Sequence, residues 1–247
     1  MTSKQIVDLL QSQEIDLILP LGACEQHGHH LPLSTDQIIA EELAARVADV
    51  VGDAVIAPSI PVGVSGHHLH FGGTATITSS TYVDHITDII SSLALHGFRT
   101  TYLVTGHAGN CGSMQTITER FTDDNVVSFD DWPAQRGIIH EVATEHLGLD
   151  PQTVGTHAGH FETSIILLLR PDLVKEQFYQ AGFIGSSSEA SAKLQSSGMQ
   201  SLSEIGVIGD PNGATAHAGE LYLNALVGHV VVGVRAHRRS SGGRTVK

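Results

Sequence analysis

Short apolar runs alternate with amphipathic helical stretches along most of this 247-residue chain. The apolar runs predict strands at residues 15–21, 54–58, 100–104 and 126–129, with a further short strand at 207–209. Apolar side chains at helical spacing predict helices at residues 37–51, 82–95, 113–121, 138–146, 163–169 and 218–234. This alternation predicts an α/β fold in which a mostly parallel sheet carries helices on both faces.

Length and local composition indicate how the chain is divided. Its length suits one large domain, and no repeat or long linker interrupts it, so we expect a single domain over residues 1–247. The segment 185–198 is rich in Ser, Gly and Ala, which predicts a mobile surface loop. Residues from about 236 to 247 combine a basic cluster with a Ser-Gly-rich end, which predicts a flexible tail.

Charge and hydropathy narrow the class of partner. The net charge of −13 at pH 7 argues against a nucleic-acid surface and favours a small-molecule or short-peptide partner. No apolar stretch reaches the length of a bilayer span, and the amino terminus lacks a basic-then-apolar signal pattern. We therefore expect a cytoplasmic protein without a membrane partner.

The segment 24–36 holds the most specific chemical signal. Glu25, His27 and Asp36 directly follow the apolar run at residues 15–21. Because Glu25 and His27 are two residues apart, their side chains point to the same side of an extended segment. Carboxylate and imidazole groups at a strand end form a ligand set for a divalent metal ion. Asp36 taken alone also suits the N-cap of the following helix, but the three residues together indicate a metal site.

Two further polar residues follow predicted strands or enter predicted helices. His107 lies just after the strand at 100–104, between Gly106 and Gly109, whose small size allows a metal ion and a substrate close to the backbone. The alternative is a histidine that only caps a strand end. Glu162 lies at the apolar start of a helix, where a carboxylate is costly to bury unless it is paired or coordinated. The alternative for Glu162 is exposure on the outer face of the helix.

Together these candidate ligands exceed what one four-coordinate ion requires. They are Glu25, His27, Asp36, His107 and Glu162. The set suits two divalent ions that share a bridging carboxylate and a bridging water, a centre that favours hydrolysis of an amide or related C–N bond. Zinc is the first expectation, with manganese or iron as alternatives, because oxygen and nitrogen ligands accommodate all three. His157, in a Gly-containing loop near Glu162, is the candidate that donates a proton to the leaving nitrogen.

Four ordered motifs resemble those of the creatininase family. They are Glu25-Gln-His-Gly-x-His-Leu-Pro-Leu-x-Thr-Asp36, Gly106-His-x-Gly-Asn110, His157-Ala-Gly-x-x-Glu-Thr-Ser164 and Gly209-Asp-Pro-x-x-Ala-Thr-Ala216. The resemblance runs from about residue 15 to the closing helix. It implies a three-layer α/β/α amidohydrolase, often a homo-hexamer, with a dinuclear zinc, manganese or iron centre. By position, Glu25, Asp36 and His107 would hold one ion, and His27, Asp36 and Glu162 the other.

The resemblance also implies roles around the centre. His157 falls where the family has its proton-donating histidine. His67 and His70 lie in the loop that borders the active site of family members, and Asn110 ends the second motif, so all three are candidates for substrate binding. A solvated loop or a contact between subunits is the alternative for the two loop histidines.

The chain departs from the family pattern in three places. Thr105 stands where an asparagine often precedes Gly-His, and Phe71-Gly-Gly-Thr74 replaces Phe-Pro-Gly-Thr. Gly109 stands where creatininase itself has a glutamate, which argues against creatinine as the substrate. The family also includes formamide hydrolases of pterin and flavin precursor pathways and a peptidase that trims the mycofactocin precursor. Residues 203–211 resemble the peptidase branch more closely.

Other readings of the same residues remain open. A thiol hydrolase would use Cys24 or Cys111, but Cys24 precedes Glu25 on an extended segment and should point away from the site. Small buried cysteines explain both residues more simply. A non-catalytic metal-binding scaffold is a second alternative, although a decayed site would not need to keep all five ligands. Nucleotide binding is excluded, because no G-x-G-x-x-G or P-loop follows a strand.

Overall fold

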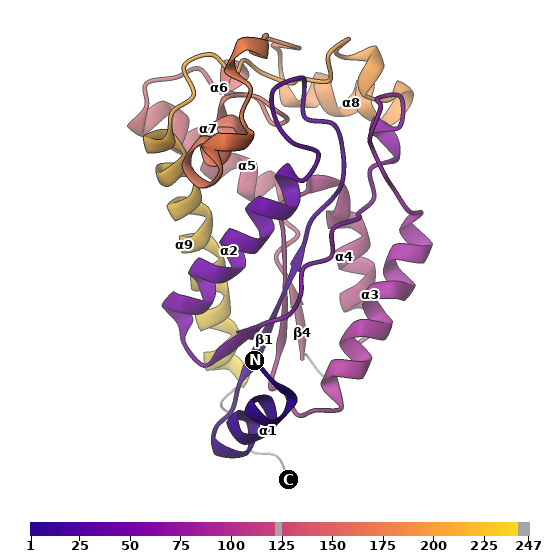
Figure 1. Ribbon diagram of the computed structural model, residues 1–247, viewed down its shortest axis with the longest axis vertical. Coiled ribbons are helices and arrows are strands. Elements are labelled where there is room, and N and C mark those ends of the chain that lie inside the picture. The colour runs from indigo at the N-terminus through magenta and orange to yellow at the C-terminus, as the bar shows by residue number, and fades with distance from the viewer. Residues whose placement is uncertain (122–124, 242–247) are drawn as a thin grey trace.

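A parallel sheet forms the centre of the protein, and the computed structural model describes residues 1–121 and 125–241 (Figure 1). Its strands are β1 (Asp16–Leu21), β2 (Ala54–Ile56), β3 (Thr101–Thr105) and β4 (Val126–Ser128). Their order across the sheet is β2-β1-β3-β4, and each pairing is parallel. The pairing of β1 with β3 ends at Leu21 and Thr105, so both strands end at the same edge. The predicted parallel α/β sheet is confirmed.

Helices cover both faces of the sheet (Figure 1). On one face lie α3 (Ser79–Ala94) and α4 (Cys111–Thr118), and on the other lie α2 (Thr35–Val51) and α9 (Ala216–Ser241). The other helices are α1 (Ser3–Ser12), α5 (Trp132–Glu141), α6 (Pro151–Val154), α7 (His160–Leu169) and α8 (Ser187–Ser197). Shorter turns are the 3-10 helices Gly66–His68, Ala108–Asn110, Pro171–Leu173, Glu176–Phe178 and Met199–Ser201 and the π-helix Val142–His146. No helix within the described ranges is long and apolar enough to cross a membrane.

An apolar core lies on each face of the sheet, because successive side chains of a strand point to opposite faces. Ile18 of β1 packs with the apolar residues of α2, α7 and α9, whereas its neighbours Leu17 and Leu19 pack with those of α3 and α4. On β3, Tyr102 and Leu103 divide in the same way. Because successive side chains point to opposite faces, a continuously apolar strand is buried on both sides. This burial fixes the sheet between its helices and places the carboxyl ends of β1 and β3 at one end of the molecule.

Two segments differ from their predicted secondary structure. The predicted loop at 185–198 contains α8, which begins after Ser186, whose hydroxyl accepts a hydrogen bond from the Glu189 amide (3.3 Å). The loop prediction is therefore wrong, because Ala190 and Leu194 pack with Met199 in a small core that composition does not reveal. At the other position, 207–209 forms no strand, only isolated bridges of Ile208.

The ends of the chain also differ from expectation. The sequence patterns did not predict α1, whose N-cap Thr2 forms a capping box with Gln5. At the other end, α9 continues to Ser241, since Arg238 donates hydrogen bonds to the buried Asp16 (2.8 Å) and to the Val51 carbonyl (2.8 Å). Residues 236–241 of the predicted tail are thus helical. The rest of that tail, 242–247, lies outside the described residues.

Candidate metal centre

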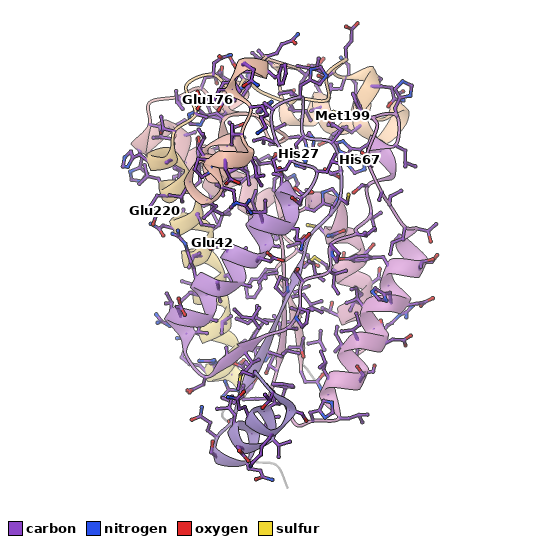
Figure 2. The ribbon with its side chains drawn as sticks, viewed as in Figure 1. His27, Glu42, His67, Glu176, Met199 and Glu220 are labelled. Atoms are coloured by element: carbon purple, nitrogen blue, oxygen red, sulfur yellow. The ribbon has the colours of Figure 1, made fainter. Side chains whose placement is uncertain are left out.

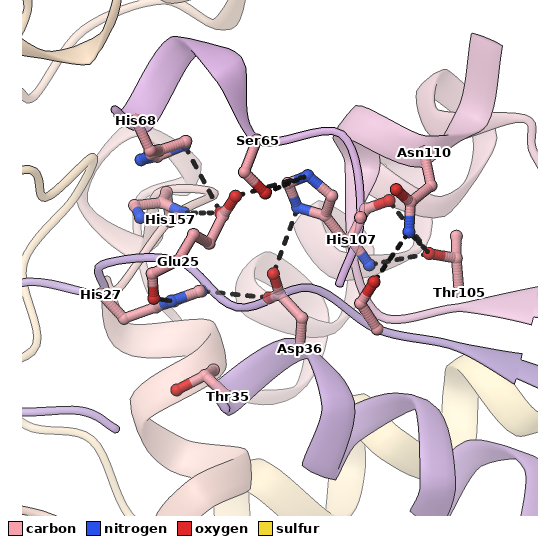
Figure 3. Close-up of polar contacts among 12 residues, drawn as sticks. Glu25, His27, Thr35, Asp36, Ser65, His68, Thr105, His107, Asn110 and His157 are labelled. Carbon is pink, nitrogen blue, oxygen red and sulfur yellow. Dashed lines mark hydrogen bonds and ion pairs between the residues drawn. The ribbon is translucent and has the colours of Figure 1, made fainter. Parts of the chain in front are cut away.

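Side chains from four separate segments meet beyond the carboxyl edge of the sheet. Figure 2 shows the place of His27 in the molecule, and Figure 3 shows Glu25, His27, Asp36 and His107 close together. Glu25 and His27 come from the loop after β1, Asp36 from the first turn of α2, His107 from the loop after β3, and Glu162 from the first turn of α7. None of the five exposes more than 5% of its surface. The structure therefore brings together all five residues that the sequence predicted as metal ligands.

Asp36 lies between two imidazoles. Its Oδ1 is 3.1 Å from His27 Nε2, and its Oδ2 is 3.2 Å from His107 Nδ1. Asp36 is the second residue of α2, and the N-cap is Ser34, so the capping alternative for Asp36 is wrong. The carboxylate instead occupies the first turn, where the helix dipole stabilises negative charge. Each oxygen of this carboxylate therefore faces a different imidazole.

Glu162 approaches His27 from the opposite side. Its Oε2 lies 3.5 Å from His27 Nε2 and accepts a hydrogen bond from the Ala158 amide (2.6 Å). Ala158 has a φ of +52°, a conformation that few non-glycine residues adopt. The buried carboxylate therefore belongs to the cluster, and the alternative of an exposed Glu162 is wrong.

Several buried atoms in this cluster make no hydrogen bond within the described residues. They are both carboxylate oxygens of Glu25, Nε2 of His27 and Oδ2 of Asp36. Buried polar atoms are rarely left without a partner, because each costs about 1–3 kcal/mol or more. A bound cation would satisfy all four atoms, so the residues present fit a metal centre.

Backbone hydrogen bonds fix the proton positions on both candidate imidazole ligands. His27 Nδ1 donates to the Glu25 carbonyl (3.1 Å), and His107 Nε2 donates to the Val64 carbonyl (3.2 Å). Since a carbonyl oxygen only accepts, the opposite nitrogen of each neutral ring carries the lone pair. These are His27 Nε2 and His107 Nδ1, the nitrogens that face Asp36. This second layer of contacts orients both rings for metal binding.

The electrostatics of the cluster favour positive charge. Burial raises the pKa of Glu25 to about 7. Burial lowers the pKa of His107, but Glu25 and Asp36 outweigh this effect and raise the pKa to about 9. The pKa of His27 also lies well above its usual range, because Asp36 and Glu162 outweigh burial. Protons and metal ions therefore compete for the same atoms.

Ligand atoms converge in more than one way. Four groups of three residues bring their ligand atoms within 4.8 Å of one another: Glu25, His27 and Asp36; His27, His157 and Glu162; Glu25, His67 and His107; and Glu25, His68 and His157. The five predicted ligands all occur in these groups. The division into two triads that share Asp36 does not coincide with them and stays a prediction.

His157 lies against the centre with a defined orientation. Its Nε2 donates to the Gln26 carbonyl (2.8 Å), and its Nδ1 lies 3.6 Å from Glu25 Oε1. Burial and the nearby His27 lower its pKa well below the usual value. The ring stands 4.2 Å from that of His27, centroid to centroid. The Nδ1 lone pair of His157 therefore faces the cluster, and one group of converging ligand atoms includes this residue.

The three predicted substrate-binding residues occupy different places. A cavity of about 110 Å³ over the cluster is lined by the half-buried His67, among others. His70 is exposed and borders a separate surface depression. Asn110 is fully buried, and its amide donates to the Gly22 carbonyl (3.0 Å) and accepts from the Val64 amide (3.1 Å), which braces the loops beneath the cluster.

The sequence predictions missed two residues that contact the centre. His68 is buried, and its Nε2 lies 3.4 Å from Glu25 Oε1. Gln26 contacts both His68 and His157. The sequence carries a signal for each: Gln26 lies between two predicted ligands, and His68 lies between His67 and His70, which are predicted to bind substrate. In an irregular loop, however, no periodicity shows which histidine points inward.

A parallel α/β sheet with a buried carboxylate and imidazole cluster at its carboxyl edge is typical of metal-dependent hydrolases. Comparison with known proteins narrows this class to one family. The model of the creatininase family, described as creatinine amidohydrolase, matches residues 1–233. The chain belongs to the creatininase family and is a hydrolase of that family.

Individual relatives agree with this assignment. The chain is 31% identical over 234 residues to the mycofactocin precursor peptide peptidase of Mycolicibacterium smegmatis, covering 92% of this chain and 85% of that protein. It is 35% identical over 175 residues to the creatinine amidohydrolase of Pseudomonas putida, covering 64% and 65%. Two solved creatininase structures, described as an Mn form and a Zn–Zn type variant, match with TM-scores of 0.74 at 26% identity over 96% of this chain and 96% and 95% of theirs. The family resemblance and the three-layer fold predicted from the sequence are confirmed.

Proposed function

We propose that the protein hydrolyses a C–N bond of an amide substrate at a dinuclear metal centre. The observation that carries the proposal is the buried cluster of three carboxylates and two oriented imidazoles, in which four atoms have no hydrogen-bond partner among the described residues. Zinc is the first candidate metal, with manganese or iron as alternatives, since the mixed ligand set accepts all three. Two such ions supply a nucleophilic water at neutral pH and polarise the substrate carbonyl.

The side chains of this protein supply the remaining steps. Asp36, Glu25, His27, His107 and Glu162 would hold the ions, and burial of these ligands keeps bulk water away. His157 would accept a proton from the attacking water on Nδ1 and pass it to the leaving nitrogen, because the Nδ1 lone pair points to the centre while Nε2 is held by the Gln26 carbonyl. This transfer makes the amine a better leaving group.

We favour a short peptide over creatinine as the substrate. The mycofactocin precursor peptide peptidase aligns with 92% of this chain, and the creatinine amidohydrolase with 64%. An added Cβ at Gly109 would lie 2.6 Å from the Val64 carbonyl oxygen and closer still to His107. The glutamate of creatininase therefore has no room at this position unless the backbone shifts.

The cavity contains a cation suited to a peptide carboxylate. Arg136 is half-buried and lines the same cavity as Glu25, and its guanidinium makes no hydrogen bond or ion pair with any part of the chain that the structure describes. Trp132 and Leu194 add apolar wall to this cavity. A free carboxylate next to an apolar side chain, as at the end of a peptide, complements these groups.

The proposal is tested with protein loaded with Zn²⁺ or Mn²⁺. We expect about two ions per chain and hydrolysis of short peptides, with little or no turnover of creatinine or N-formyl compounds. Efficient turnover of creatinine would contradict the substrate assignment. Bound metal without turnover of any amide would favour the scaffold alternative. The homo-hexamer and the cytoplasmic location implied earlier stay predictions, and sedimentation analysis tests the first.

Arg136→Gln tests the carboxylate contact. We expect KM to rise about 10-fold for a peptide with a free carboxylate, because a charge-assisted pair contributes about 1.5–3 kcal/mol. KM for the same peptide with a C-terminal amide should not change. Arg120→Gln is the control, since Arg120 pairs with Asp84 at the surface. An equal rise in KM for both peptides in Arg136→Gln would show that Arg136 does not bind the substrate carboxylate.

A further inference from the structure

We propose that His68 is a further catalytic residue, which donates a hydrogen bond from Nε2 to the carbonyl oxygen of the substrate as this oxygen gains negative charge. We further propose that Gln26 is the positioning residue that fixes the proton of His68 on Nε2. The inference rests on the proposed function, but its structural part, the proton position, can be measured without any substrate.

Backbone contacts fix the orientation of the Gln26 amide. Its Oε1 accepts a hydrogen bond from the Gly28 amide (2.9 Å), and its Nε2 donates to the Gly206 carbonyl (3.0 Å). Because backbone N–H only donates and C=O only accepts, the two ends of the side chain cannot be exchanged. Gly206 has a φ of +71°, and an added Cβ there would collide with the Gln26 amide. The glycine therefore allows the close approach on which this orientation depends.

The fixed amide determines the tautomer of His68. Gln26 Nε2 lies 2.8 Å from His68 Nδ1 and 3.0 Å from His157 Nε2. Because His157 Nε2 donates its own proton to the Gln26 carbonyl, the second proton of Gln26 Nε2 goes to His68 Nδ1, which must accept. A neutral imidazole with an accepting Nδ1 carries its proton on Nε2. This N–H points toward Glu25 Oε1, and Figure 3 shows the two groups facing one another.

The Nε2 proton of His68 is available to a substrate. His68 Nε2 lies 3.4 Å from Glu25 Oε1, which is longer than a good N–H···O hydrogen bond. That oxygen has no hydrogen-bond partner within the described residues. His68 also lines the cavity over the cluster. Because Nδ1 of His68 accepts from the Gln26 amide, it carries no proton, and the ring is neutral with its proton on Nε2. A fixed neutral donor of this kind stabilises charge that develops in the transition state.

The same geometry argues against His68 as a metal ligand. Glu25, His68 and His157 form one of the groups whose ligand atoms converge. Coordination through Nε2 would move the proton of His68 to Nδ1, where it would face the donating amide of Gln26. Two donors at 2.8 Å repel each other, so the contact with Gln26 opposes coordination.

Nitrogen-15 NMR of histidine-labelled, zinc-loaded protein tests the tautomer. We expect the His68 signals of a protonated Nε2 and an accepting Nδ1, assigned by their loss in His68→Gln. Gln26→Leu should produce a mixture of tautomers, whereas Gln115→Leu, at an exposed position of α4, should change nothing. A proton on Nδ1 in the unaltered protein would overturn the inference.

A pair of substitutions of similar size tests the catalytic role. His68→Leu removes the donor, and we expect kcat to fall about 10²- to 10³-fold, as for loss of a donor to a developing oxyanion. His68→Gln keeps an N–H donor and should recover at least tenfold of this loss. Metal content should stay unchanged in both, and His85→Ala, exposed on α3, should match the unaltered enzyme. Loss of metal in both His68 variants would make His68 a ligand, and an unchanged kcat would exclude the donor role.

Inorganic phosphate supplies a readout that does not depend on turnover. This tetrahedral anion resembles the charged oxygen of an attacked amide, and calorimetric titration of zinc-loaded protein measures its binding. We expect binding about 10-fold weaker in His68→Leu, which is about 1.4 kcal/mol, and near-normal binding in His68→Gln. If no amide is hydrolysed, the proposed function fails, while the NMR and phosphate results still decide the inference. Equal binding by all three proteins would contradict it.

Discussion

Asp36 is the residue that most directly links the sequence to the centre. It is fully buried, each of its oxygens faces a different imidazole, and burial alone would raise its pKa. The positive neighbours His27 and His107 outweigh burial and lower that pKa, which keeps the carboxylate ionised. A buried charge that is paired in this way is weak evidence for a stabilising role, and its position supports the proposed role of Asp36 as a metal ligand.

Asp36→Ala should abolish binding of both ions, because it removes the only carboxylate that faces both imidazole ligands among the described residues. Metal analysis after loading with zinc should fall from about two ions per chain to near zero. Asp49→Ala is the matched control, since Asp49 is exposed on the same helix. Retention of one firmly bound ion in Asp36→Ala would show that Asp36 does not bridge.

His157→Ala should keep the ions and slow turnover. Loss of a positioned proton donor typically reduces kcat about 10²- to 10⁴-fold. Metal analysis and kcat are measured together, with His146→Ala as the control at an exposed position. If His157→Ala instead loses metal, His157 is a ligand and another group supplies the proton.

At the scale of elements, the centre depends on how closely β3 approaches α2. Gly106 follows β3, and a Cβ added there would contact the Asp36 carbonyl group and lie 3.1 Å from the Ala40 amide. The start of α2 can therefore pack on this strand end only if residue 106 has no side chain. This contact places Asp36 within reach of His107.

Gly106→Ala should loosen the centre without removing any ligand. Overpacking of this kind costs about 1–3 kcal/mol, and the shift of α2 should weaken zinc binding. Urea unfolding and zinc titration measure the two effects. Gly112→Ala is the control, because a Cβ there meets nothing within 4 Å and alanine favours a helix. Unchanged zinc affinity in Gly106→Ala would show that the junction does not position Asp36.

At the scale of the whole molecule, the cluster sits at one end of two continuous apolar cores. These cores fix the ends of β1, β3, α2 and α7 relative to one another. The polar groups can therefore converge at a place where several buried atoms make no hydrogen bond within the described residues. Such a site should gain stability from its ligand, since a ligand that binds only the folded state shifts unfolding by mass action.

Removal of metal should lower the unfolding temperature, and the difference should depend on pH. The pKa of His107 is raised to about 9 and that of Glu25 to about 7, so in the metal-free protein protons occupy these groups more as pH falls. Because protons compete with the ions, the stabilisation by a fixed zinc concentration should grow from about pH 6.5 to about pH 8.5. Thermal melts with zinc or with a chelator measure the difference. An equal difference at both pH values would contradict the competition.

The sequence by itself determined the parallel α/β fold, the strand-end position of the centre and its five buried polar residues. It could do so because apolar periodicity fixes which segments are buried, and because the ends of parallel strands meet at one edge. Only the tertiary structure decided that α8 is a helix, that His68 rather than His70 faces the centre, and that Gln26 orients it. Those outcomes depend on contacts between segments far apart in the chain, such as Gln26 with Gly206. Local sequence patterns do not predict such contacts.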